Sequence, residues 1–92
     1  MSGTARRTVT ICNDKGLHAR ASAKFVGLVA RFPDEVSVAV LKDGHSVPGG
    51  SIMGLMMLGA AKGSDIDIQV EGPDAELYCA KLVGLVMDGF GE

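Results

Sequence analysis

The sequence contains no tryptophan, and its aromatic residues are one tyrosine and three phenylalanines. A core must therefore be aliphatic, and 92 residues that are 47% hydrophobic are enough for one small core. We expect one domain over residues 1–92. The chain also lacks an excess of charge, since the formal net charge is −2 and the pI is about 5.6. This balance excludes the electrostatic signature of nucleic-acid or anionic-membrane binding, so we expect protein partners.

Cysteine is scarce, and its spacing suggests no special chemistry. Cys12 and Cys79 are far apart and form neither a C-x-x-C motif nor a metal-ligand pattern. We expect two reduced thiols that pack as small apolar groups, with no metal site and no cofactor. The first ten residues, MSGTARRTVT, contain no apolar run. They therefore predict neither a signal peptide nor a membrane span, and we expect a cytoplasmic protein.

Glycine, by contrast, is abundant, with 13 residues, and indicates short elements joined by tight turns. Alternating apolar residues predict strands, helical spacing predicts helices, Pro33 ends the first helix and the sequence KDG marks a hairpin. The expected strands are 8–12, 35–41, 45–47 and 65–71, and the expected helices are 19–31, 51–61 and one that includes Pro73 in its first turn and closes the chain.

The strands alternate with one apolar face only. Val9 and Ile11 share a face in the first strand, and Ile66, Ile68 and Val70 share a face in the last. A sheet of such strands has one wet face, so all three helices should cover the other. The order β-α-β-β-α-β-α then predicts an α+β fold, an open-faced β-sandwich with a four-stranded antiparallel sheet in the order 1-4-2-3.

A histidine lies where the first helix begins, in the sequence DKGLHARASAKFV. The first turn of a helix offers free amides and the positive end of the helix dipole, so the amides of Ala19 and Arg20 could bind a phosphoryl group on the His18 ring. The same field favours a neutral, nucleophilic ring. The Arg20 guanidinium could add fixed charge, and Gly16 would allow a close approach of the loop. On spacing alone, a solvated cap residue is the more common role of such a histidine. We interpret His45 as an exposed strand residue.

The segments GLHARASAKFV and SIMGLMMLGAAKG together resemble the histidine-containing phosphocarrier proteins (HPr) of the bacterial phosphoenolpyruvate-dependent phosphotransferase system. The resemblance implies a phosphocarrier and not an enzyme, active as a monomer. His18 would accept a phosphoryl group on Nδ1 from phosphorylated enzyme I and pass it to enzyme IIA domains, and Arg20 would stabilise the charge. Ala21 stands where the family usually has proline, a change that costs no hydrogen-bond donor.

Ser51 matches the serine that a dedicated kinase phosphorylates as a regulatory switch in many HPr proteins. The residues alone indicate a helix N-cap, and both roles can hold because a capping hydroxyl is also exposed. Gly54 offers no side chain to complete a capping box. Gly50 replaces the lysine that often precedes this serine in the family, which makes kinase recognition less secure.

The helix expected over 51–61 is apolar almost all round. Leu55 and Leu58 should face the sheet. Three other side chains fall on a different face and should form an exposed docking patch beside the histidine loop: Ile52, Met53 and Met56. Core filling is the alternative role for a single methionine, but flexible thioethers suit a carrier that meets several partners.

Two alternatives to a sugar-transport carrier stay open at this point. One is a regulatory paralogue of the nitrogen-related branch, which would use His18 for signalling. The other is a small interaction or ligand-sensing domain without covalent chemistry, which would have no need of a neutral imidazole at a helix start.

Overall fold

The computed structural model describes residues 2–92 and confirms the predicted order of elements. The elements are β1 (Ser2–Thr10), α1 (Ala19–Val29), β2 (Ser37–Lys42), β3 (His45–Pro48), α2 (Ile52–Met57), β4 (Asp65–Pro73) and α3 (Ala75–Met87), followed by a short 3-10 turn, Gly89–Gly91.

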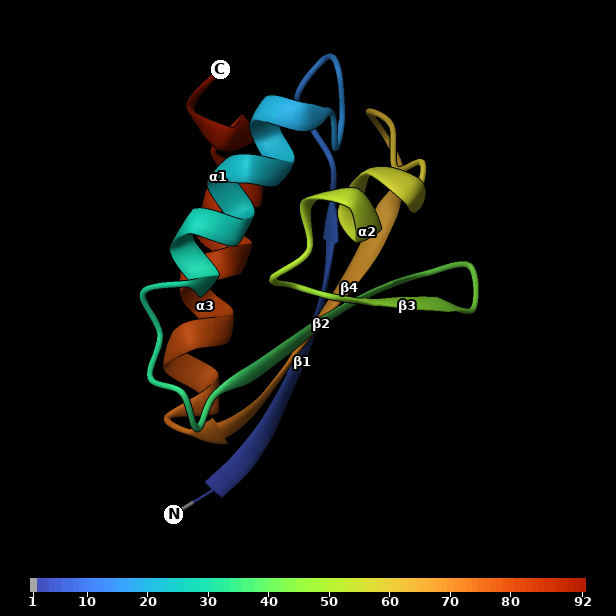
Figure 1. The fold of residues 1–92 in the computed structure, drawn as a ribbon. Coiled ribbons are helices and arrows are strands. Elements are labelled where there is room, and N and C mark those ends of the chain that lie inside the picture. The colour runs from blue at the N-terminus through green and yellow to red at the C-terminus, as the bar shows by residue number, and fades with distance from the viewer. Residues whose placement is uncertain (1) are drawn as a thin grey trace.

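The four strands form one antiparallel sheet in the predicted order β1-β4-β2-β3. The register places apolar residues opposite each other, with Val9 facing Ile66 and Val40 facing Ile68. Helix α3 packs on β1 and β4, α2 lies next to β3, and α1 contacts both helices (Figure 1). The helices therefore cover one face of the sheet, as the one-sided alternation predicts.

The core lies between this face and the helices. Leu55 of α2, Phe25 of α1 and Leu82 of α3 are fully buried and meet the inward side chains of β4. Phe90 in the C-terminal 3-10 turn is also fully buried, so it anchors the end of the chain to the core. Burial of aliphatic and phenylalanine side chains is the main stabilising term for such a small fold.

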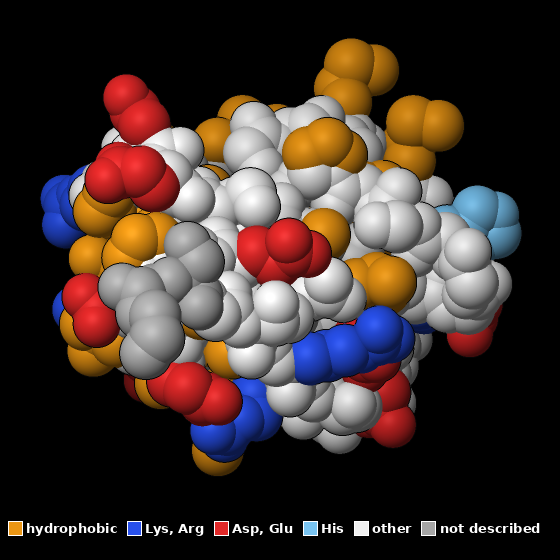
Figure 2. Space-filling view, turned by 90° about the horizontal axis from the view of Figure 1, so that it is seen from below, with side chains coloured by type: hydrophobic (Ala, Val, Ile, Leu, Met, Phe, Trp, Pro, Cys, Tyr) orange, Lys and Arg blue, Asp and Glu red, His pale blue; other side chains and the backbone are white. Residues whose placement is uncertain are grey.

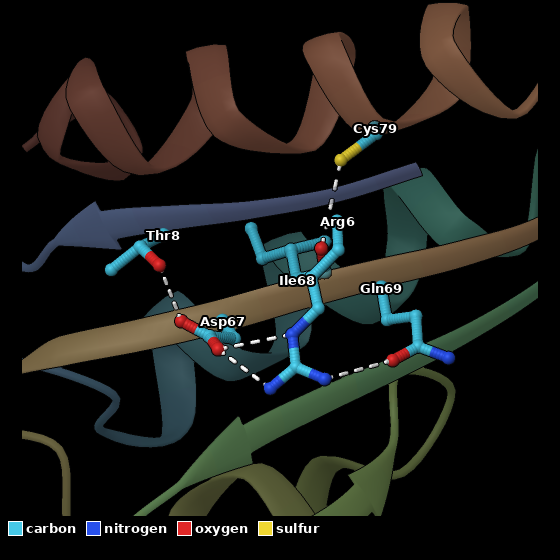
Figure 3. A network of polar contacts seen from close by, with 6 residues as sticks. All are labelled: Arg6, Thr8, Asp67, Ile68, Gln69 and Cys79. Atoms are coloured by element: carbon cyan, nitrogen blue, oxygen red, sulfur yellow. Dashed lines mark hydrogen bonds and ion pairs between the residues drawn. The ribbon is translucent and has the colours of Figure 1, made fainter. Parts of the chain in front are cut away.

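The opposite face of the sheet is polar. On it, Arg6 Nη2 donates to Asp67 Oδ2 at 2.8 Å and Thr8 Oγ1 donates to Asp67 Oδ1 at 2.6 Å (Figure 3). The Thr8 hydrogen bond, and after it the one from Arg6, lowers the pKa of Asp67 below its ordinary value. Gln69 accepts from Arg6 at 3.4 Å in the same network. This is the wet face that the sequence predicts.

The first strand is longer than expected, because it begins at Ser2 and not at Thr8. Its early half is not recognisable from alternation, since Arg6, Arg7 and Thr8 are consecutive polar residues. Arg7 lies toward the helical side and stays exposed there, where its Nη2 lies 2.9 Å from Glu76 Oε2 in the first turn of α3. Pairing with the nine residues of β4 stabilises this half of the strand.

The helix boundaries also differ from the sequence predictions. Pro73 is the last residue of β4 and not part of a helix, because Gly72 with φ +128° precedes it and Asp74 with φ +57° turns the chain into α3. Helix α2 ends at Met57 instead of Ala61, since Gly59 adopts φ +66° just beyond it. Helix α1 ends at Val29 in a tighter final turn, where Arg31 N donates to Leu28 O.

Both cysteines are free thiols, as predicted, but only one packs as an apolar group. Cys79 is fully buried, and burial raises the pKa of its thiol. Cys12 is exposed, which corrects the prediction for this residue. It lies beyond the end of β1, where its Sγ donates to the carbonyl of Val86 at 3.4 Å instead of pointing into the core.

Candidate functional site

The loop before α1 is clamped to the segment that follows α2. Leu17 N donates to Ala60 O at 3.0 Å, and Ile11 N donates to Ser64 O at 2.8 Å. Gly16 adopts φ +61°, and a Cβ at this position would lie 2.2 Å from Ala60 O. Gly16 therefore allows a close approach of the loop to the chain after α2, a contact that the sequence did not predict.

His18 is the N-cap residue of α1, in extended conformation with φ −73° and ψ 179°. Its carbonyl accepts the first helical hydrogen bond, from Ser22 N at 2.9 Å, but its side chain makes no capping bond. The ring therefore lies beside a helix N-terminus whose first amides, including those of Ala19 and Arg20, are not capped by any side chain among residues 2–92. This is the juxtaposition of imidazole and free amides that the sequence predicts.

Cationic side chains line the hollow in front of the ring. Lys15, Arg20 and Lys24 line the same hollow as His18. The exposed Arg20 side chain makes no ion pair with any residue in 2–92, so its guanidinium is available to an incoming anion. Lys24 Nζ donates to Phe90 O at 2.6 Å, which attaches α1 to the C-terminal turn.

A carboxylate from the end of the chain contacts the ring. Glu92 Oε2 lies 2.5 Å from His18 Nε2, and these two side chains are only 25% and 26% exposed. The hydrogen bond with His18 is the largest influence that lowers the pKa of Glu92. The end of the chain, marked C in Figure 1, lies at the same end of the molecule as the start of α1. The contact joins residues 74 positions apart in the sequence, so reasoning about the helix alone missed it.

Asn13 holds this carboxylate in place. Its Nδ2 donates to Glu92 Oε1 at 3.2 Å and to Gly16 O at 2.9 Å. The Asn13 residue is only 6% exposed, so its bond to Gly16 is buried, while its bond to Glu92 is partly buried. Because both partners are acceptors, the amide nitrogen must face them. Asn13 thus links the histidine loop to the end of the chain.

Ser51 is the N-cap of α2, as the residues alone indicate. Its Oγ accepts from Gly54 N at 3.0 Å, and its side chain is half-buried. Helix α2 has only six residues, so its dipole contributes less to an anion at this end than that of a full-length helix would.

The expected division of α2 into a buried and an exposed face is present. Leu55 is fully buried, whereas Met53 is 74% exposed and Ile52 and Met56 are 40% and 43% exposed. Met57 is 80% exposed and belongs to the same surface, although the sequence analysis did not include it. Met57 lies four residues after Met53, a spacing that places both side chains on the same helix face and could have predicted this. We call Ile52, Met53, Met56 and Met57 the α2 patch.

The α2 patch and the histidine loop are neighbours in space. The segment that leaves α2 reaches Ala60, whose carbonyl binds Leu17 directly before His18. Figure 2 shows hydrophobic side chains projecting along one edge of the molecule, apart from the acidic and basic side chains. The structure therefore brings His18 and Arg20 into one hollow and joins the histidine loop to the segment that leaves α2, while Ser51 lies at the other end of α2.

Comparison with known proteins gives the family. The family model described as "PTS HPr component phosphorylation site" matches residues 5–88. The chain belongs to the HPr family. It is a phosphocarrier protein and not an enzyme, and members of this family work with the enzymes of the phosphotransferase system.

Relatives from two branches of the family match almost the whole chain. The phosphocarrier protein HPr of Cupriavidus necator is 41% identical over 87 residues, which are 95% of this chain and 96% of that protein. The phosphocarrier protein NPr of Escherichia coli K12 is 35% identical over 89 residues, 97% of this chain and 98% of that one. The crystal structure of HPr-C-His from Thermoanaerobacter tengcongensis has a TM-score of 0.88 at 39% identity and covers 96% of this chain and 97% of its own. The likeness to solved HPr structures confirms the fold.

Two further features concern membrane crossing and metal binding. Within residues 2–92 no helix has both the length and the apolar character that a bilayer crossing requires. Over the same part of the chain, no three His, Cys, Asp or Glu side chains are grouped so that they could hold a metal ion.

Proposed function

We propose that this chain accepts a phosphoryl group on His18 Nδ1 from phosphorylated enzyme I and passes it to enzyme IIA domains in the cytoplasm. The observation that carries the proposal is the position of the ring, beside the uncapped N-terminus of α1 with Nε2 already engaged. No group among residues 2–92 hydrogen-bonds Nδ1, so this nitrogen is available to the donor.

The transfer is a displacement at phosphorus. The Nδ1 lone pair forms a new bond to phosphorus, and the bond between phosphorus and the donor group breaks, with its electron pair left on the donor. The phosphoryl oxygens carry negative charge throughout this exchange, and the amides of Ala19 and Arg20 and the Arg20 guanidinium can stabilise it. Transfer to enzyme IIA is the same exchange in reverse, with a different partner.

We propose that the α2 patch docks the partner proteins. Four large apolar side chains on one short helix, at 40–80% exposure, form an apolar surface of a kind that soluble proteins use for partners. The three methionines among them are unbranched and flexible, so one surface can fit both enzyme I and an enzyme IIA domain.

We also propose that phosphorylation of Ser51 regulates this docking. The hydroxyl lies directly before Ile52, so a phosphate there would add about 1.5–2 negative charges beside the α2 patch. A docked partner would have to desolvate that charge unless it supplied a cation. Gly50 in the position of the usual lysine is the feature that counts against recognition by the family's kinase.

The regulatory, nitrogen-related branch is the second candidate, because a protein named NPr matches 97% of this chain. Both branches use the same chemistry at the histidine, so the difference lies in which partner proteins are recognised. Rates of acceptance from the sugar-type and the nitrogen-type enzyme I, measured side by side at equal concentrations, will assign the branch.

The experiment that tests the proposed function is incubation with phosphoenolpyruvate and enzyme I, followed by mass spectrometry. We expect one added phosphoryl group that acid removes, its loss in His18→Ala, and slower addition in Arg20→Ala. His45→Ala is the matched control, since His45 is exposed on β3 far from the helix start. Acceptance at the wild-type rate by His18→Ala protein would contradict the proposal. A protein that takes up no phosphoryl group at all would favour a non-covalent interaction domain.

A further inference from the structure

We propose that Glu92 is a positioning residue that holds the His18 ring in the tautomer protonated at Nε2 and thereby leaves the lone pair on Nδ1. The inference rests on the proposed phosphoryl transfer at His18 and deepens it, because it says how one of the two ring nitrogens becomes the nucleophile. It concerns the Glu92 side chain only.

The hydrogen bond between Glu92 and His18 determines which ring nitrogen carries the proton. An ionised carboxylate can only accept, so the proton between Glu92 Oε2 and His18 Nε2, 2.5 Å apart, belongs to the ring nitrogen. A neutral imidazole carries one N–H, and with that hydrogen on Nε2 the lone pair lies on Nδ1. The lowered pKa of Glu92 keeps its carboxylate ionised at neutral pH, as this geometry requires.

The Glu92 carboxylate is held in a fixed position. Asn13, which is nearly fully buried, donates to the second oxygen of Glu92 at 3.2 Å. The backbone is held as well, since Glu92 N donates to Gly89 O at 3.1 Å and the buried Phe90 ring lies between them in sequence. A carboxylate with both oxygens engaged and a fixed backbone can orient the ring, whereas a freely moving acid could not.

Positive charge develops on the His18 ring during transfer. When Nδ1 bonds to phosphorus, the ring still carries its Nε2 proton and gains positive character. The Glu92 carboxylate stabilises that charge through the hydrogen bond that it already makes, and no proton needs to move. Lys24, whose ammonium lies near this end of the chain, donates to the Phe90 carbonyl and leaves both Glu92 oxygens to His18 and Asn13.

Nitrogen NMR of the histidine ring tests the inference directly. With ¹⁵N-labelled histidine and at a pH where the ring is neutral, we expect wild-type His18 to show a protonated Nε2 and an unprotonated Nδ1. Glu92→Ala should give a mixture of tautomers. Glu92→Gln should retain much of the wild-type pattern, because its amide oxygen can still accept from Nε2. Asn13→Ala should lie between wild type and Glu92→Ala, since it frees the carboxylate without removing it.

The same variants are then assayed for phosphoryl acceptance at saturating enzyme I. We expect Glu92→Ala to be slower by about 10-fold or more, the effect typical of removing a carboxylate that orients a metal-bound histidine, with Glu92→Gln faster than Glu92→Ala. Glu76→Ala, which removes an exposed acid from α3 on another part of the surface, is the matched control.

Each outcome is decisive. An unchanged tautomer in Glu92→Ala would overturn the inference, and if that protein were still phosphorylated the proposed function would stand. A changed tautomer with an unchanged transfer rate would refute the positioning role. A wild-type protein with the expected tautomer but no phosphoryl acceptance would instead refute the proposed function. Thermal unfolding of each variant verifies that none of these results reflects loss of the fold.

Discussion

The clamp between the histidine loop and the segment after α2 can be tested with two glycines of almost equal conformation. Gly16 has φ +61° and Gly59 has φ +66°, both in the left-handed region. A Cβ at Gly16 would lie 2.2 Å from Ala60 O and 2.8 Å from Ala61 Cα, whereas a Cβ at Gly59 would meet nothing within 4 Å. Alanine at the two positions therefore separates the cost of backbone conformation from the cost of the close approach.

The expected magnitudes follow from that difference. Alanine in the left-handed conformation costs about 1–2 kcal/mol at either position. At Gly16 the overpacking adds about 1–3 kcal/mol, and loss of the Leu17–Ala60 hydrogen bond adds about 1 kcal/mol. We therefore expect Gly16→Ala to lose about 2–4 kcal/mol more than Gly59→Ala. A domain of this size has a free energy of unfolding of about 5–15 kcal/mol, so Gly16→Ala protein should still fold at low temperature.

Urea unfolding followed by circular dichroism measures this difference, and phosphoryl acceptance measures its effect on the site. Relief of the contact requires the loop to move by roughly 1 Å, a displacement that can slow a reaction by about 100-fold. Gly16→Ala should therefore accept the phosphoryl group slowly even where it is fully folded. Equal stability losses in the two variants would refute the argument that the loop is clamped against Ala60.

Three further predictions concern docking, regulation and pH. Met53→Lys should weaken enzyme I binding by about tenfold with little change in thermal stability. Leu77→Lys, at an exposed apolar residue of α3, is the control and should leave enzyme I binding unchanged. A large stability loss in Met53→Lys would mean that Met53 has a core role. Ser51→Asp should lower enzyme I affinity relative to wild type and Ser51→Ala, less so at high salt, and equal affinities in all three would exclude a docking switch. Thr8→Val should destabilise the fold at neutral pH, where the depressed pKa of Asp67 contributes stability. Urea titrations should show this contribution fade as the pH falls from about 3.9, the ordinary value of an unfolded chain, through the lower pKa of Asp67 in the fold.

Most of the fold could be predicted because its strands and helices have strong apolar periods. The alternation in β4 and the helical spacing that includes Phe25 in α1 each determine an element and its buried face. The failures occurred where the local pattern and the tertiary structure disagree. Arg6 and Arg7 belong to a strand only because β4 pairs with them, and Pro73 suits a helix start as well as it suits a strand end.

The site was predictable in part, for a different reason. His18 and Arg20 are recognisable because the segment GLHARASAKFV around them resembles the HPr family, whereas their position at a helix start alone favours a solvated cap residue. Glu92 is 74 residues from His18, and an acid near the end of a chain has no local pattern that would associate it with an imidazole. Asn13 likewise has no local pattern that would identify it as the partner of Glu92. Such contacts depend on how the C-terminal 3-10 turn folds back over the loop, which local periodicity does not encode.

The arrangement of the loop suggests how one small surface can serve several proposed partners. On one side the loop binds the segment after α2 through Ala60, and on the other it binds Glu92 through Asn13. The reacting ring is therefore attached to two fixed supports, while the neighbouring α2 patch presents exposed, flexible methionines that can change conformation to fit each partner. Transfer requires Nδ1 to meet phosphorus within a few tenths of an ångström, which favours a rigid nucleophile. Docking of different proteins requires a flexible surface, and the methionines of the α2 patch can provide that flexibility without moving the ring.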